Sequence, residues 1–99
     1  MRVRFTPEAE QQAEESDTWW RQHRPEARDL FARELRLATD RILSTPDIGT
    51  VAAVVHGRTV RRLLMPRTRH HVYYSRGPEQ DVLVVHAICG APRGEGPPL

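Results

Sequence analysis

The 99-residue sequence lacks lysine and asparagine, has one cysteine, and contains no long apolar run. Cys89 has no second cysteine with which to form an internal disulfide, which is typical of a reducing compartment. No segment approaches the roughly 18 apolar residues that a membrane helix needs. Met1 leads directly into Arg2-Val3-Arg4-Phe5, where a secretory signal would have an apolar stretch. We therefore expect a cytoplasmic protein that does not associate with a membrane.

The sequence also lacks the short motifs of several enzyme classes. It has no glycine-rich phosphate loop, no zinc-type spacing of Cys and His, and no nucleophile elbow. His70 adjoins His71, and His86 precedes Cys89 by three residues, but neighbouring residues in a strand point to opposite faces. We therefore expect no metal site and no cofactor.

Length and charge limit what the chain can be. A chain of this length can form only one hydrophobic core. We therefore expect a single domain over residues 1–99, with 90–99 as an extended tail. Residues 1–50 hold eight arginines and ten acids, a net charge of −2, whereas residues 51–99 hold seven arginines and three acids, a net charge of +4. Residues 56–76 contain six arginines and no acid, a pattern that suits a polyanion or an acidic protein.

The N-terminal half reads as a strand followed by two helices. Residues 2–5 alternate polar and apolar, which predicts a short strand. Thr6-Pro7 then predicts a helix start, and small residues with Trp20 form one stripe of a helix over 7–23. Arg24-Pro25 ends this helix and starts a second one that runs to about residue 43.

Two charged residues, Glu34 and Arg41, fall within the apolar arc of the second helix. Either the arc is divided between two packing partners, or Glu34 meets an arginine from the sheet. We expect the first, because an unpaired buried charge is costly.

The C-terminal half reads as strands over 59–65, 70–74 and 81–88, joined by short turns that imply an antiparallel meander. Residues 51–55 fit either a loop or an extension of the first of these strands. The predicted fold class is therefore α+β: strand, helix, helix, three strands, with an antiparallel sheet and a helical hairpin on one face.

Basic and aromatic side chains concentrate on two adjacent predicted strands and the turn between them. If the strands pair, these side chains form one patch suited to a phosphate backbone or an acidic protein. The alternative is that the arginines face solvent and the tyrosines are cross-strand core pairs. The patch comprises Arg61, Arg62, Arg67, Arg69, His70, His71, Tyr73 and Tyr74.

Four stretches together resemble the ParE/RelE superfamily of toxins from type II toxin–antitoxin systems, in particular its ParE-like plasmid stabilisation members. They are VRFTPEA at 3–9, the pair Trp19-Trp20, VRRLLMPRTRHHVYY at 60–74, and GAPRG at 90–94 followed by PPL at 97–99. The resemblance spans nearly the whole chain. It implies the same strand-helix-helix-three-strand fold and a neutralising antitoxin as partner.

The resemblance implies one of two activities. RelE-like members cut mRNA on the ribosome without a metal, using basic residues of the sheet, and ParE-like members inhibit DNA gyrase. Arg62 matches one basic position of the nucleases and Arg93 a late arginine. Leu64 and His71 stand where basic residues are expected, and no tyrosine follows Tyr74.

We therefore expect a ParE-like gyrase inhibitor that an antitoxin neutralises, and no enzymatic activity. The alternatives are a metal-independent ribosome-dependent endoribonuclease, with Arg62, His71 and Arg93 as catalytic residues, and a non-toxic binding or scaffold domain. The expected residues for binding the target or the antitoxin are Arg61, Arg62, Arg67, Arg69, His71, Tyr74 and Arg93.

Overall fold

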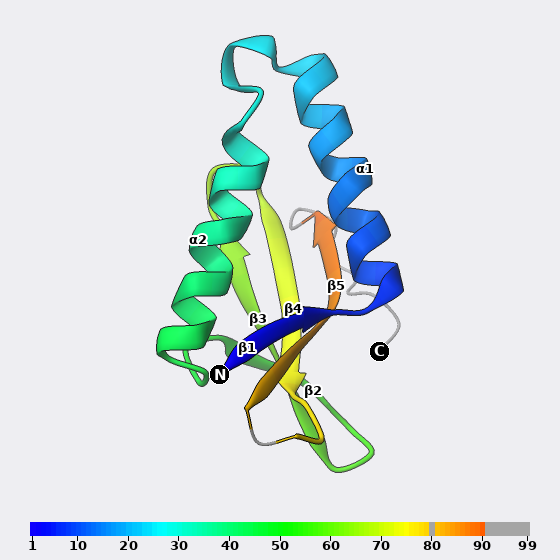
Figure 1. Cartoon of the computed structure of the whole chain (residues 1–99), viewed down its shortest axis with the longest axis vertical. Helices are drawn as coiled ribbons and strands as arrows, with labels where there is room; N and C mark the ends of the chain where they lie inside the picture. The colour runs from blue at the N-terminus through cyan, green and yellow to red at the C-terminus, as the bar shows by residue number, and fades with distance from the viewer. Residues whose placement is uncertain (80, 91–99) are drawn as a thin grey trace.

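The computed structural model, which describes residues 1–79 and 81–90, has an α+β fold in which two helices stand against one sheet (Figure 1). The elements are β1 (Arg2–Phe5), α1 (Pro7–His23), a 3₁₀ turn (Pro25–Ala27), α2 (Leu30–Ser44), β2 (Thr50–Val55), β3 (Arg58–Met65), β4 (His70–Arg76) and β5 (Val82–Gly90). The predicted fold class is confirmed. The prediction of three strands after the helices is wrong by one, because residues 50–55 form a strand of their own.

The sheet has the order β1-β5-β4-β3-β2. Strands β2 to β5 pair antiparallel with their neighbours, and the β2–β3 turn is tight, with His56 and Gly57 at φ of 51° and 75°. Strand β1 pairs parallel with β5, from Arg2 opposite Val82 to Phe5 opposite Val85. The sheet is therefore mixed rather than wholly antiparallel, because the helical hairpin returns the chain to the other edge of the sheet.

Helix α1 begins and packs as its sequence predicts. The Thr6 hydroxyl accepts a hydrogen bond from the Ala9 amide at 3.1 Å, and Pro7 occupies the first turn. Ala9 is fully buried, and Ala13 and Trp20 pack against the same core. The small residues let the helix approach β5 closely.

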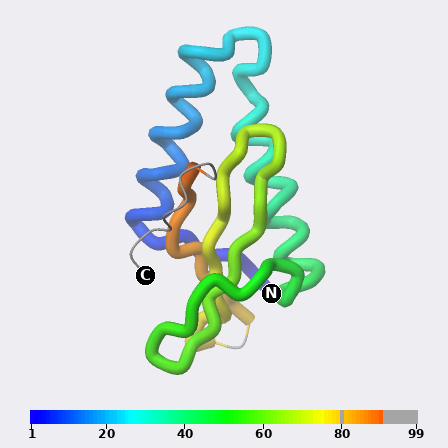
Figure 2. Tube along the Cα trace, turned by 180° about the vertical axis from the view of Figure 1, so that it is seen from behind, coloured from blue at the N-terminus to red at the C-terminus, as the bar shows by residue number. Residues whose placement is uncertain are grey.

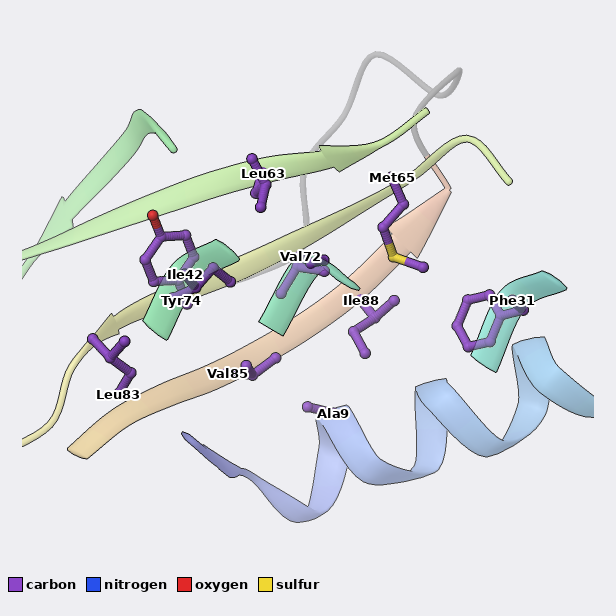
Figure 3. Packing of buried hydrophobic residues seen from close by; sticks show 11 residues of the cluster. Ala9, Phe31, Ile42, Leu63, Met65, Val72, Tyr74, Leu83, Val85 and Ile88 are labelled. Atoms are coloured by element: carbon purple, nitrogen blue, oxygen red, sulfur yellow. The ribbon is translucent and has the colours of Figure 1, made fainter. Parts of the chain in front are cut away.

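Helix α2 begins at Leu30, five residues later than predicted, because Pro25 starts a separate 3₁₀ turn. Its buried side chains Phe31, Ala38 and Ile42 belong to the main core. In the close-up, Phe31 lies toward Met65 and Ile88, at the other end of the core from Tyr74 (Figure 3). None of the described helices is long and apolar enough to span a membrane.

The two faces of the sheet differ. Both helices cover one face, where the main core lies. No helix of residues 1–79 and 81–90 covers the other face (Figure 2). That face holds a smaller cluster of Val60, Tyr73 and Ala87. We call it the helix-free face. Gly90, predicted to begin a tail, ends β5 instead, and the rest of the predicted tail lies outside the described residues.

Candidate functional surface

The strands place basic side chains, and no acidic side chains, on the helix-free face. None of the five strands contains any of the thirteen Asp and Glu residues of the chain. Val3 and Phe5 pack into the main core, so the alternation of β1 directs Arg4 to the helix-free face. Arg62 lies opposite Tyr73 of the smaller cluster, and His71 is two residues before Tyr73 on the same side of β4.

Arg62 and His71 share this face, and Arg69, in the β3–β4 turn, is close enough for its charge to act on His71. We call these three residues the His71 cluster. Burial, and then the positive charges of Arg62 and Arg69, lower the pKa of His71 from its usual 6.5. The ring is therefore neutral at pH 7 and offers one donor and one acceptor. The structure thus brings together three of the predicted site residues.

A buried carboxylate holds the β3–β4 turn that carries Arg67 and Arg69. Glu34 of α2, 6% exposed, accepts hydrogen bonds from the Arg67 amide at 2.7 Å, the Thr68 amide at 2.8 Å and the Thr68 hydroxyl at 2.7 Å. The alternative that Glu34 meets an arginine side chain of the sheet is wrong, since its partners are the backbone and hydroxyl of the turn. Helix α2 packs against both α1 and the sheet, as the other alternative had it. Arg69 has a φ of 61°, a left-handed conformation that this anchoring supports.

Arg61 and Tyr74, also predicted for the site, lie on the helix side. The Arg61 guanidinium donates to the Gly49 carbonyl at 2.8 Å and lies 3.6 Å from the Asp47 carboxylate. The Tyr74 hydroxyl donates to the Pro46 carbonyl at 2.8 Å and accepts from the Gly49 amide at 2.9 Å. Both residues fasten the α2–β2 loop, so the structure does not bring them together with the His71 cluster.

A groove of about 520 Å³ opens where the helical hairpin tip faces the β3–β4 turn. Trp19, 44% exposed, and Trp20 line one side, and Arg67 and Arg69 line the other. The Arg24 guanidinium lies 5.5 Å from the centre of the Trp19 ring and 6.0 Å from that of Trp20, within cation–π range. No spacing between residues in the sequence would have joined the Trp pair to this turn. Arg93 lies outside the described residues.

Across residues 1–79 and 81–90, no three His, Cys, Asp or Glu side chains gather as metal ligands would. Cys89 faces the smaller cluster, and burial raises the pKa of its thiol.

Comparison with known protein families identifies the family of this chain. The family model of the ParE toxin of the type II toxin–antitoxin system parDE matches residues 3–90, from the second residue of β1 to the end of β5. The chain belongs to the ParE toxin family. A search of the curated proteins gave no significant match. In this ParE-family toxin, then, the His71 cluster and the groove at the hairpin tip are two places where the described residues offer basic side chains for binding.

Proposed function

We propose that this toxin inhibits DNA gyrase in the cytoplasm and that a cognate antitoxin neutralises it. Membership of the ParE family supports a toxin with an antitoxin partner. The observation that carries the proposed binding surface is the helix-free face, whose strands present arginines and no carboxylates. Such a face suits an enzyme that holds DNA, because it attracts phosphates and acidic side chains.

The His71 cluster is the centre of the proposed contact. Two guanidinium groups, Arg62 and Arg69, provide fixed positive charge and planar donor pairs for oxyanions. The neutral His71 ring adds a hydrogen bond without further charge. The anchoring of the β3–β4 turn by Glu34 holds Arg69 in place before binding, which lowers the entropy cost of association.

The antitoxin has a separate place to bind. A groove of about 390 Å³ between α1 and α2 is lined by Phe5, Ala13, Phe31 and Leu35, with Ala32 exposed at its rim. An amphipathic antitoxin segment that folds on binding fits this apolar groove, and its acidic residues would meet the arginines of the toxin.

A matched pair of substitutions tests that groove. Ala32→Arg places a long charged side chain at the rim of the groove, whereas Leu37→Arg places one at a position of α2 that is 62% exposed and does not line it. We expect Ala32→Arg to weaken antitoxin binding more than tenfold and Leu37→Arg to leave it unchanged, measured by calorimetry. Equal affinities would remove the groove from the interface.

One observation favours a second function, ribosome-dependent cleavage of mRNA. A neutral His71 beside Arg62 could take the proton of a ribose 2′-hydroxyl while the guanidinium stabilises charge on the phosphate. Leu64 lies opposite His71 in the β3–β4 register, where the RelE-like pattern has a basic residue. This apolar neighbour favours the gyrase proposal.

Induction of the toxin in cells separates the two functions. Gyrase inhibition predicts a raised SOS response with intact transcripts, and mRNA cleavage predicts cut transcripts without an early SOS response. Growth without harm would contradict both and favour a non-toxic binding domain.

A further inference from the structure

A second basic group lies elsewhere on the helix-free face, around a β-bulge in β5. In the β4–β5 ladder Tyr73 pairs with Ala87 and Tyr74 with Val85, which leaves His86 as the extra residue of the bulge. Bulges redirect side chains and are frequent near functional sites. Val85 packs into the main core, whereas the His86 ring reaches Ser75 of β4.

The contact with Ser75 favours one tautomer of His86. Ser75 is 2% exposed, and its hydroxyl lies 2.7 Å from His86 Nε2, which is its hydrogen-bond partner among the described residues. If the hydroxyl donates to Nε2, the proton of the neutral ring is on Nδ1, whereas the other tautomer would leave the buried Ser75 proton without an acceptor. Within residues 1–79 and 81–90, no atom accepts a hydrogen bond from Nδ1.

Two arginines flank this ring from opposite sides. Arg4 is on β1, beside β5, and Arg58 is on β3, beyond β4. Both lie close enough that their charges, together with the larger effect of burial, lower the pKa of His86. Both are exposed, and neither forms an ion pair with a carboxylate of the described residues.

We propose that Arg4, Arg58 and the Nδ1–H of His86 bind a phosphate of a nucleic acid backbone. The three groups are donors only, and no strand supplies a carboxylate to compete. Asp47 of the α2–β2 loop lines a cavity together with Arg58, but its carboxylate lies 3.6 Å from the guanidinium groups of Arg61 and Arg76. Guanidinium groups grip the oxygens of a phosphate in pairs, and the imidazole N–H adds a third direction. The three residues of this site do not belong to the His71 cluster. They are also different from Arg61 and Tyr74, which form the hydrogen bonds to the α2–β2 loop.

The spacing along β3 favours a nucleic acid over a single acidic side chain. Arg58 and Arg62 are four residues apart on the same side of one strand, which is about 13 Å. That distance corresponds to about four base-pair steps measured along the axis of a duplex, and to about two nucleotides along one strand because the strand also winds around the axis. One nucleic acid strand can therefore contact the His86 site and the His71 cluster together. DNA held by gyrase and mRNA carry the same phosphodiester, so the site does not depend on which target the toxin attacks.

Fluorescence anisotropy with the full chain tests the site. The probes are a labelled 12-base-pair DNA duplex and a labelled 12-nucleotide RNA, each titrated at several salt concentrations. The variant is Arg4→Gln with Arg58→Gln, both at exposed positions, and the control is Arg28→Gln with Arg33→Gln, which removes the same charge from the helical hairpin.

We expect the variant to bind both probes at least about tenfold more weakly than the unaltered toxin. The slope of log affinity against log salt should become shallower by about 2, because two phosphate contacts are lost, whereas the control variant should keep the slope of the unaltered toxin. Binding of the duplex alone identifies DNA as the source of the phosphate, and binding of the RNA alone identifies RNA; either supports the site. An unchanged slope in the variant, or no binding of either probe by the unaltered toxin, would overturn it. Ser75→Ala, which frees the His86 ring, gives a second readout: we expect weaker binding of both probes with an unchanged salt slope.

Discussion

Arg61 and Arg62 are neighbours in β3, yet their side chains lie on opposite faces of the sheet. Arg61 bonds the carbonyl of Gly49 and lies beside Asp47 on the helix side. Arg62 lies near His71 on the helix-free face and has no carboxylate partner among the described residues. One arginine therefore stabilises the fold, and the other is available for binding.

Alanine substitutions should separate these two roles. Arg61→Ala removes a hydrogen bond from a charged donor to Gly49 O, and we expect the free energy of unfolding to fall by about 1 to 2 kcal/mol. Arg62→Ala, at an exposed position, should change it by less than about 0.5 kcal/mol. Urea unfolding followed by circular dichroism measures both. Equal losses would show that the two arginines are not divided in this way.

The sequence predicted the fold better than the surface. Caps, prolines and apolar stripes are local signals, and they placed β1, both helices and the later strands nearly where they lie. The facing of Arg61 and Arg62 was not readable, because Leu63, Leu64 and Met65 follow them without alternation. The sequence likewise did not show which of the neighbours Tyr73 and Tyr74 faces the helices.

Features that depend on distant contacts were out of reach of the sequence. The bonds from Glu34 to Thr68 join residues 34 positions apart, and no pattern in either segment announces them. The bulge at His86 interrupts an apolar run that reads as a regular strand. A signal for Arg4 was present, since β1 alternates strictly, but its position on the helix-free face depends on the partner strand.

Replacement of Glu34 by glutamine, its neutral amide counterpart, should destabilise the fold. A glutamine has one acceptor oxygen and places an NH₂ group against one of the backbone amides that Glu34 now binds. We expect Glu34→Gln to lower the free energy of unfolding by about 1 to 3 kcal/mol and to speed amide exchange at Arg67 and Thr68. The matched control, Glu14→Gln on the exposed side of α1, should do neither. Slow exchange at the turn in Glu34→Gln would argue against the anchor.

Stability should fall as the pH drops below the usual histidine pKa of 6.5. Burial lowers the pKa of His70, His71 and His86, so the unfolded chain takes up protons at a pH where the folded chain does not. Their contribution is full above pH 6.5 and is lost as the pH falls toward the lowered values.

The variant His70→Asn isolates one of these groups. Its amide NH₂ can replace the ring Nδ1–H, which donates to the Thr68 carbonyl at 2.9 Å, but it does not titrate. We expect the urea midpoint to fall less between pH 7.5 and pH 5.5 in this variant than in the unaltered toxin. Parallel curves for the two proteins would contradict this role for His70.

Inhibition of purified gyrase tests the central claim, that the helix-free face of the sheet is the working surface of the toxin. The comparison uses Arg62→Glu with Arg69→Glu in the His71 cluster and Arg28→Glu with Arg33→Glu on the helical hairpin, all at exposed positions, so that the charge change is the same. The measured quantity is the toxin concentration that halves DNA supercoiling. We predict that the first pair raises this concentration more than tenfold and that the second pair leaves it within about twofold of the unaltered toxin. Equal inhibition by both pairs, or a greater loss from the second, would contradict the account.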